Sequence, residues 1–127
     1  MTGVQTCALP IYIKNFLGRI RFDNDVYDEA IAAYLELLAL GSRIDSVMMA
    51  VTYNNLGRVY ERIKDYDRAF RYIEQSIAIY LAIGDANRAA GSLLNLGVVQ
   101  YELQQLEKAQ VCFQNSLAQA QIGRAHV

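Results

Sequence analysis

Few side chains in this chain of 127 residues have the types and spacing that chemistry requires. The closest group of oxygen ligands is acidic and comprises Asp23, Asp25, Asp28 and Glu29. Hard cations prefer several oxygen ligands of this kind. The same residues also suit a turn and a helix N-terminus, where a short carboxylate accepts hydrogen bonds from free N–H groups. We favour helix capping over metal binding for this group.

Catalytic patterns are missing from the sequence. It has no phosphate loop of the G-x-x-x-x-G-K-[ST] kind, and no nucleophile is spaced with a base that would activate it. Cys112 directly precedes Phe113 in a helical pattern, which favours a small, partly buried hydrophobe over a redox thiol. We therefore predict no catalytic residue, no metal site and no cofactor, and hence no enzyme activity in this segment.

A tandem repeat dominates the chain. Leu-Gly pairs recur at intervals of 39 and 40 residues, and an alanine follows each glycine twelve residues later. The copies are Leu17-Gly18 with Ala30, Leu56-Gly57 with Ala69, and Leu96-Gly97 with Ala109. A glycine inside an amphipathic helix costs about 1 kcal/mol relative to alanine. The same cost at three equivalent positions indicates a shared steric need, so we predict that two helices approach closely there.

The middle copy shows which elements must place these residues. Tyr53, Leu56 and Tyr60 share one helical face, Asp65-Tyr66 interrupts the pattern, and Ala69 resumes it. No segment shows the alternation of a half-buried strand. We predict six helices, over about 11–22, 26–40, 43–63, 66–83, 86–103 and 106–121.

The helix ends carry matching signals. Asp25 and Asp65 precede the second helix of their copies and are predicted to cap it. Gly41 and Gly84 follow those helices, where a left-handed residue is wanted.

With the Leu-Gly pair and the following alanine in three aligned copies, and an aromatic residue four positions after that alanine in the first and third, residues 12 to 120 resemble the tetratricopeptide repeat (TPR) family. The repeat here has about 40 residues instead of the usual 34, and Gln100 replaces the expected tyrosine of the third copy. The resemblance implies an all-α, right-handed solenoid of three antiparallel helix pairs, with copies at 12–42, 43–84 and 85–120. We interpret the chain as a fragment of a longer array, so we expect native end caps to be missing, with exposed apolar ends and self-association through them.

The resemblance also implies a concave groove that holds a peptide or partner domain, lined by the first helix of each copy. The groove positions carry Asn15, Arg19, Asn54, Asn55, Arg58, Arg62, Asn95 and Tyr101, accompanied by Glu61, Val98 and Glu102. An asparagine amide is both donor and acceptor, so a ladder of them suits the backbone of an extended peptide. Arginine binds carboxylates in a bidentate manner. The alternative for each residue is a solvated surface or a bond between neighbouring helices. The lysine and arginine of a chaperone-type carboxylate clamp are replaced by Gly91 and Asn95, which disfavours chaperone tails.

Both ends of the chain differ from the repeat. Residues 2–11, TGVQTCALPI, and residues 122–127, IGRAHV, back-translate to the two strands of a common short-read sequencing adapter. We therefore interpret 1–11 and 121–127 as translated adapter and assign no role to Cys7, Pro10 or His126.

Composition limits the classes of partner. Without the two ends the chain has 11 basic and 13 acidic side chains, so it lacks the basic surface that nucleic acid or an anionic membrane would attract. No run reaches the roughly 18 apolar residues that span a bilayer. A single remaining cysteine, Cys112, allows no disulfide framework and fits a reducing compartment such as the cytoplasm.

Two functions are compatible with these patterns. The first is a protein-interaction module within a larger bacterial protein, which the family resemblance implies. The second is an accessory segment of a multidomain enzyme, such as a sensor kinase, nucleotide cyclase or caspase-like protease, with no ligand of its own. Fold alone does not choose between them.

Overall fold

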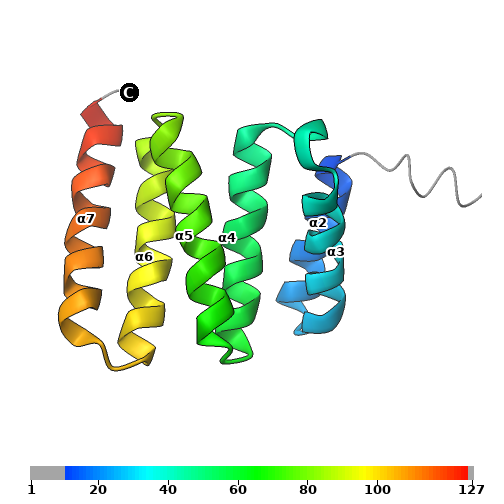
Figure 1. Cartoon of the computed structure of the whole chain (residues 1–127), viewed down its shortest axis with the longest axis horizontal. Coiled ribbons are helices and arrows are strands. Elements are labelled where there is room, and N and C mark those ends of the chain that lie inside the picture. Colours follow the sequence, from blue (N-terminus) through cyan, green and yellow to red (C-terminus); the bar gives the residue numbers. More distant parts are fainter. Residues whose placement is uncertain (1–10, 126–127) are drawn as a thin grey trace, which may run out of the picture.

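The computed structural model describes residues 11–125, which form a row of six α-helices (Figure 1). Their bounds are α2 (Ile11–Asp23), α3 (Tyr27–Ala39), α4 (Ser46–Arg62), α5 (Tyr66–Ala82), α6 (Ala86–Glu102) and α7 (Leu106–Ala125). A short 3-10 helix, η1 (Gly41–Arg43), joins α3 to α4. The predicted all-α stack of three helix pairs, α2/α3, α4/α5 and α6/α7, is confirmed.

The predicted helix bounds need two adjustments. The third helix begins at Ser46 and not at 43, because η1 occupies the preceding residues and the Asp45 carboxylate accepts a hydrogen bond from the Met48 N–H at 2.7 Å. The last helix continues to Ala125, beyond the predicted end at 121. Cys7, Pro10 and His126 lie outside the described residues.

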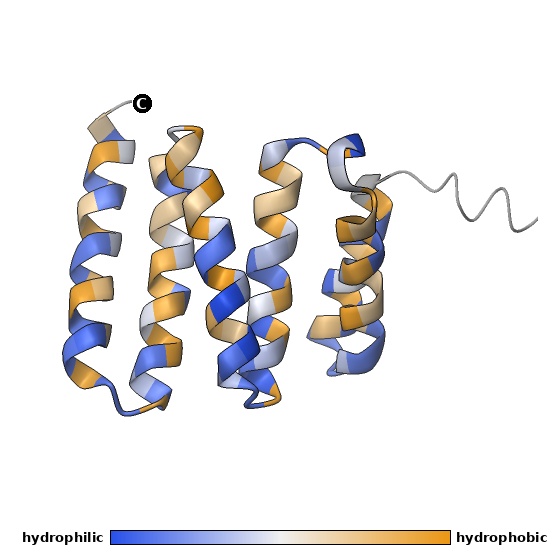
Figure 2. Cartoon of the chain, in the orientation of Figure 1, coloured by the Kyte–Doolittle hydropathy of each residue, from blue (hydrophilic) through white to orange (hydrophobic). Residues whose placement is uncertain are grey.

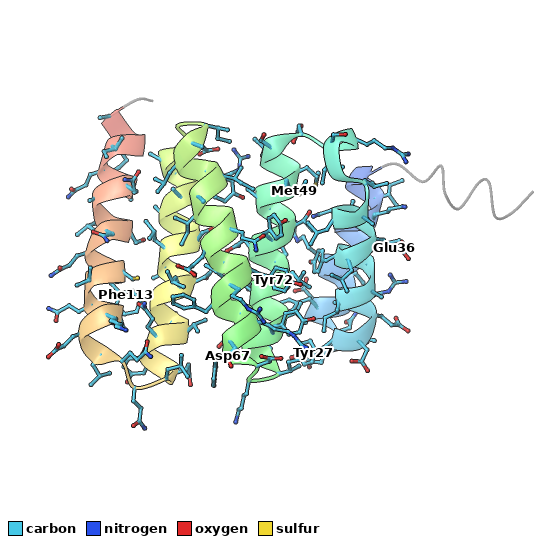
Figure 3. The ribbon with its side chains drawn as sticks, in the orientation of Figure 1. Tyr27, Glu36, Met49, Asp67, Tyr72 and Phe113 are labelled. Carbon is cyan, nitrogen blue, oxygen red and sulfur yellow. The ribbon has the colours of Figure 1, made fainter. Side chains whose placement is uncertain are left out.

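The predicted close approach of two helices occurs in every pair. A Cβ atom built on Gly18 would lie 2.7 Å from Cε1 of Tyr34, and one built on Gly57 would lie 2.5 Å from Cγ1 of Ile73. In the third pair an added Cβ on Gly97 meets the ring of Phe113, which points from α7 toward α6 (Figure 3). Each of these partner side chains comes four residues after a repeat alanine. The glycines therefore make room for a large side chain of the second helix.

The repeat alanines complete these contacts. Ala30, Ala69 and Ala109 are at most 1% exposed. In the middle pair the backbone oxygen of Ala69 lies 3.1 Å from the Cβ position of Gly57, so backbone and side chain both border the glycine. Small residues on both helices are thus required for the spacing of the pair.

The turn inside each pair repeats one backbone conformation. Asp25, Lys64 and Gln104 have φ of 60°, 66° and 61°, and they occupy equivalent positions between the two helices. Asp25 is thus equivalent to Lys64 and not to the capping residue Asp65, so the prediction of a capping role for Asp25 is wrong. The cap position belongs to Val26, and the Asp25 carboxylate instead accepts a hydrogen bond from the Tyr27 hydroxyl at 2.7 Å.

The other predicted helix ends are confirmed. The Asp65 carboxylate accepts a hydrogen bond from the Arg68 N–H at 3.3 Å, so it caps α5. Asp85, which was not among the predicted caps, caps α6 in the same manner. Gly41 and Gly84 have positive φ between consecutive pairs, where residues with a Cβ would be strained.

The core runs through the middle of the stack, and apolar and polar residues alternate along the helices (Figure 2). Its largest fully buried side chains include Tyr34, Leu37, Leu56 and Ile73. Beside them, the ring of Tyr72 is stacked on the ring of Tyr60 at 5.6 Å and on that of Tyr53 at 6.0 Å.

The outer helices expose side chains whose equivalents are buried inside the stack. Ile20 of α2 is 38% exposed, whereas its equivalents Val59 and Val99 are fully buried. Leu117 of α7 is 57% exposed, whereas its equivalent Ile77 is 8% exposed. A neighbouring helix pair covers the buried equivalents, and the described residues offer no such cover at the two ends.

The close approach predicts a stability difference between two helical glycines. Gly57→Leu overpacks the contact with Ile73 and is expected to lower the free energy of unfolding by about 1–3 kcal/mol. The control is Gly91→Leu, because Gly91 is exposed and no atom lies within 4 Å of an added Cβ. That control should gain several tenths of a kcal/mol from better helix propensity. Equal urea midpoints for the two variants would contradict the steric role of Gly57.

Candidate functional site

The first helices of the three pairs, α2, α4 and α6, form one face of the stack, which we call the inner face. The middle helix α4 contacts both α2 and α6. All eight predicted groove residues lie on these three helices. The face therefore collects amide and guanidinium side chains from positions that are far apart in the sequence.

A hydrogen-bond network crosses three helices at the junction of the second and third pairs. The Ser76 hydroxyl on α5 donates to Ser92 Oγ on α6 at 2.7 Å, and the Ser92 hydroxyl donates to Asn54 Oδ1 on α4 at 3.1 Å. Asn95 Nδ2 donates to the same Asn54 oxygen at 3.0 Å. Ser76 and Ser92 are fully buried, so the network is anchored in the core.

This network fixes which amide groups face outward. Asn54 Oδ1 already accepts two hydrogen bonds, so the side-chain amino group of Asn54 is left with both of its donors. Asn95 uses one amino hydrogen and keeps its carbonyl oxygen as an acceptor. Both side chains are only half-buried, so these groups are accessible. The pair offers a donor and an acceptor side by side, which is what one peptide group needs.

The structure separates the other predicted amides from this pair. Asn55 is half-buried, and no side-chain hydrogen bond involves it within residues 11–125. Asn15, the equivalent of Asn54 on α2, is 9% exposed, and its Nδ2 has no hydrogen-bond partner among residues 11–125. A buried donor without an acceptor costs about 1–3 kcal/mol, so Asn15 destabilises the fold at this position. Tyr101 is 60% exposed near the end of α6.

Beside the amide pair lies a small hollow of ≈ 40 Å³. It is lined by Arg58, Glu61, Ile73, Asn95 and Val98. Four of these residues belong to α4 and α6, and Ile73 of α5 closes the hollow between them. The hollow therefore lies between Asn95 of the amide pair and Arg58, one of the predicted groove residues.

The predicted arginines gather where α2 meets α4. The guanidinium carbons of Arg58 and Arg62 lie 5.0 and 5.2 Å from the centroid of the Phe22 ring. Burial raises the pKa of Tyr34 to about 12, and the charges of Arg19 and Arg58 oppose this shift. Both arginines therefore lie close enough to Tyr34 for their charges to act on its hydroxyl.

Three members of the site were missing from the sequence-based prediction. Ser76 and Ser92 fall where the helical period predicts core, and a hydroxyl within an apolar stripe is the signal that could have identified them. Phe22 lies three residues after Arg19, at the position that Glu61 and Tyr101 hold in the later copies. An aromatic residue at a polar groove position was the corresponding signal for Phe22.

Other chemistry finds little support within residues 11–125. These residues contain no group of three or more His, Cys, Asp or Glu side chains that could hold a metal ion. Burial raises the pKa of the Cys112 thiol, which favours the unreactive protonated form. None of the helices of this part of the chain is long and apolar enough to cross a membrane. The site provides hydrogen bonds and positive charge.

Comparison with protein families identifies the repeat. A family model described as tetratricopeptide repeat matches residues 10–82, and a second model of the same description matches residues 91–120. No curated protein matches the chain.

Several solved structures share the fold. BtubC (BKLC) from P. vanneervenii has 28% sequence identity and a TM-score of 0.79, and the match covers 86% of this chain and 46% of that chain. The Rap conjugation gene regulator of plasmid pLS20, in complex with the Phr* peptide, has 23% identity and a TM-score of 0.74 over 87% of this chain and 31% of that chain. The first TPR of Spaghetti (RPAP3), bound to the HSP90 peptide SRMEEVD, has 20% identity and a TM-score of 0.71 over 86% of this chain and 78% of that chain. The chain thus spans less than half the length of BtubC.

The buried network predicts non-additive effects on stability. Ser92→Ala leaves Ser76 without its acceptor and Asn54 with one donor fewer, so we expect a loss of about 1–3 kcal/mol in the free energy of unfolding. Ser76→Ala with Ser92→Ala removes both hydroxyls, and the double variant should lose less than the sum of the single losses. Urea denaturation of the four proteins measures this coupling. Strictly additive losses would show that the two hydroxyls do not interact.

Proposed function

The chain belongs to the tetratricopeptide repeat family, and on this premise we propose that it is a protein-interaction module whose inner face binds an extended peptide segment of a partner protein. We further propose that its three repeats occupy 12–42, 43–84 and 85–120. Each proposed repeat contains one helix pair.

The amide pair on α4 and α6 carries this proposal. Because Ser92 and Asn95 both donate to Asn54 Oδ1, the pair presents outward an amino group and a carbonyl oxygen in fixed orientations. A peptide backbone presents one acceptor and one donor per residue. Binding to the backbone leaves side-chain selection to the neighbouring positions.

Similar structures support a peptide ligand over a purely structural role. Two of the compared proteins, the Rap regulator and the Spaghetti domain, are complexes with peptides. No observation of the same weight favours an accessory segment without a ligand. Those peptides are ligands of those proteins. Which peptide this chain binds depends on the residues of its own inner face.

Asn15, Arg19, Asn55 and Tyr101 extend the proposed binding surface on either side of the amide pair. Asn15 is equivalent to Asn54 one repeat later, and Asn55 is equivalent to Asn95 one repeat earlier. The exposed ring of Tyr101 provides apolar surface at the α6 end of the face. Together they make a face long enough for several residues of an extended chain.

A peptide array probed with the purified chain tests this function. For peptides that bind, Asn95→Ala and Asn55→Ala should each weaken affinity by about 2- to 12-fold, the equivalent of one lost hydrogen bond. Asn115→Ala is the matched control, because Asn115 is an exposed asparagine on α7, outside the inner face. Fluorescence anisotropy gives the affinities. Equal affinities for the three variants would show that Asn55 and Asn95 do not contribute to peptide binding.

We also propose that the apolar ends of the stack associate with each other in solution. The exposed Ile20 and Leu117 lie on opposite end helices, in positions where inner copies pack on a neighbour. Light scattering should show concentration-dependent association that Leu117→Lys reduces. Leu81→Lys, at an exposed leucine of α5 within the stack, should have no such effect. A monomer at every concentration would contradict this proposal.

A further inference from the structure

The junctions between successive helix pairs use equivalent positions of the repeat. We call the side of a pair that packs on the following pair its forward face, and the side that packs on the preceding pair its rear face. Where the second pair meets the third, Asn54 of the forward face accepts hydrogen bonds from Ser92 and Asn95 of the rear face. Asn15 on α2 and Asn55 on α4 hold the equivalent positions where the first pair meets the second. Both junctions therefore bring a forward face against a rear face.

At the two ends of the row the same positions carry apolar side chains. Leu94 holds the position of Asn54 on the forward face of the last pair and is 50% exposed. Phe16 holds the position of Asn95 on the rear face of the first pair and is 58% exposed. Ile13, in the position of the donating serine, is half-buried beside it on the same helix. The hydrogen-bonding positions inside the row are thus matched by apolar positions on both end faces.

An aromatic ring and an arginine are matched in the same way. At the first junction, Cζ of Arg58 lies 5.0 Å from the centroid of the Phe22 ring. Tyr101 is the equivalent of Phe22 on the forward face of the last pair and is 60% exposed. Arg19 is the equivalent of Arg58 on the rear face of the first pair and is also exposed. Asp23 holds the position of the second arginine at that ring, so the end faces offer one cation–π contact in place of two.

The second helices add apolar area to the forward end. Leu106 and Leu117 of α7 are 59% and 57% exposed, whereas their equivalents Tyr66 and Ile77 on α5 belong to the core inside the row. On the rear end, Ile20 of α2 is 38% exposed. Covering such side chains removes apolar surface from water and stabilises whatever contact covers them.

Each end face complements the opposite face better than it complements itself. Two forward faces would bring two Tyr101 rings together without an arginine, and two rear faces would bring two Arg19 charges together. The two ends also lie at opposite limits of the row, so each can be occupied without blocking the other (Figure 1). A contact between unlike faces repeats from copy to copy and gives an open chain unless its rotation closes a ring.

We propose that copies of this chain associate head to tail, with the forward face of one copy on the rear face of the next, so that the row of helix pairs continues in its internal register. Leu94 then packs on Phe16 and Ile13 of the next copy. Tyr101 packs on Arg19 of the next copy. This inference rests on the proposed association of the apolar ends and adds which faces meet. A second copy is the occupant because one chain carries the matching replacements on both of its end faces.

Two variants that each block one face test this arrangement. Phe16→Glu places a carboxylate on the rear face, and Leu94→Glu places one on the forward face. Each variant alone should have its association constant lowered at least about tenfold, because a charge in an apolar contact loses its water. Mixed in equal amounts, the two variants should form a dimer and nothing larger, since only one intact forward face meets one intact rear face. Sedimentation velocity at a concentration where the unchanged chain forms larger species measures both results.

Controls separate the contact from effects on the fold. Leu81→Glu changes an exposed leucine of α5 within the row and should leave association unchanged. Circular dichroism verifies that each variant is helical. Tyr101→Ala and Arg19→Ala remove smaller side-chain contacts, and each should weaken association about two- to fivefold. Because both belong to one contact, the double variant should be little weaker than the weaker single variant.

Four outcomes would overturn the inference. Dimers of Phe16→Glu alone would show that two forward faces meet, and dimers of Leu94→Glu alone would show that two rear faces meet. A mixture of the two variants that stays monomeric would also contradict the head-to-tail contact. These three results leave the association of the ends standing. An unchanged chain that is monomeric at every concentration would reject the inference and that association together, and none of the four bears on peptide binding.

Discussion

The structure depends on one steric constraint, the contact between a glycine of the first helix and a large side chain of the second helix in each pair. Tyr34, Ile73 and Phe113 occupy the space that a Cβ on Gly18, Gly57 or Gly97 would need. This contact sets the spacing within a pair and repeats in all three copies. Because the pairs then stack in one direction, their first helices lie on one face. The positions of the glycines thus determine which helices form the proposed binding surface.

Polar groups inside the stack give that face its chemistry. Ser76 and Ser92 are buried in a mostly apolar core, where Ser76 donates to Ser92 and Ser92 donates to Asn54. A satisfied buried network restricts the orientations of its members. The amides of Asn54 and Asn95 are consequently fixed before any ligand arrives. Contact with the Phe22 ring likewise orders the guanidinium groups of Arg58 and Arg62.

The fold could be predicted almost entirely from the sequence, because three copies repeat the same spacing. Periodicity placed the helices to within a few residues, and the recurring glycines indicated the close contacts. The capping role predicted for Asp25 was wrong because Asp25 precedes the cap position by one residue. Only an alignment of this turn with the turn before α5 shows that Val26, and not Asp25, is equivalent to the capping residue Asp65. Which asparagine pairs with Asn95 could not be predicted from the sequence. Asn54 and Asn55 are adjacent, and the rotation of α4 against α6 decides that Asn54 makes the bond.

The most direct test is a side-chain amide NMR titration of the whole chain with a peptide selected from the array. We predict that the side-chain amide signals of Asn54 and Asn95 shift on binding, together with backbone signals of α2, α4 and α6, while the signals of Asn115 on α7 stay in place. Shifts confined to α5 and α7, with those of Asn54 and Asn95 unchanged, would contradict docking on the inner face.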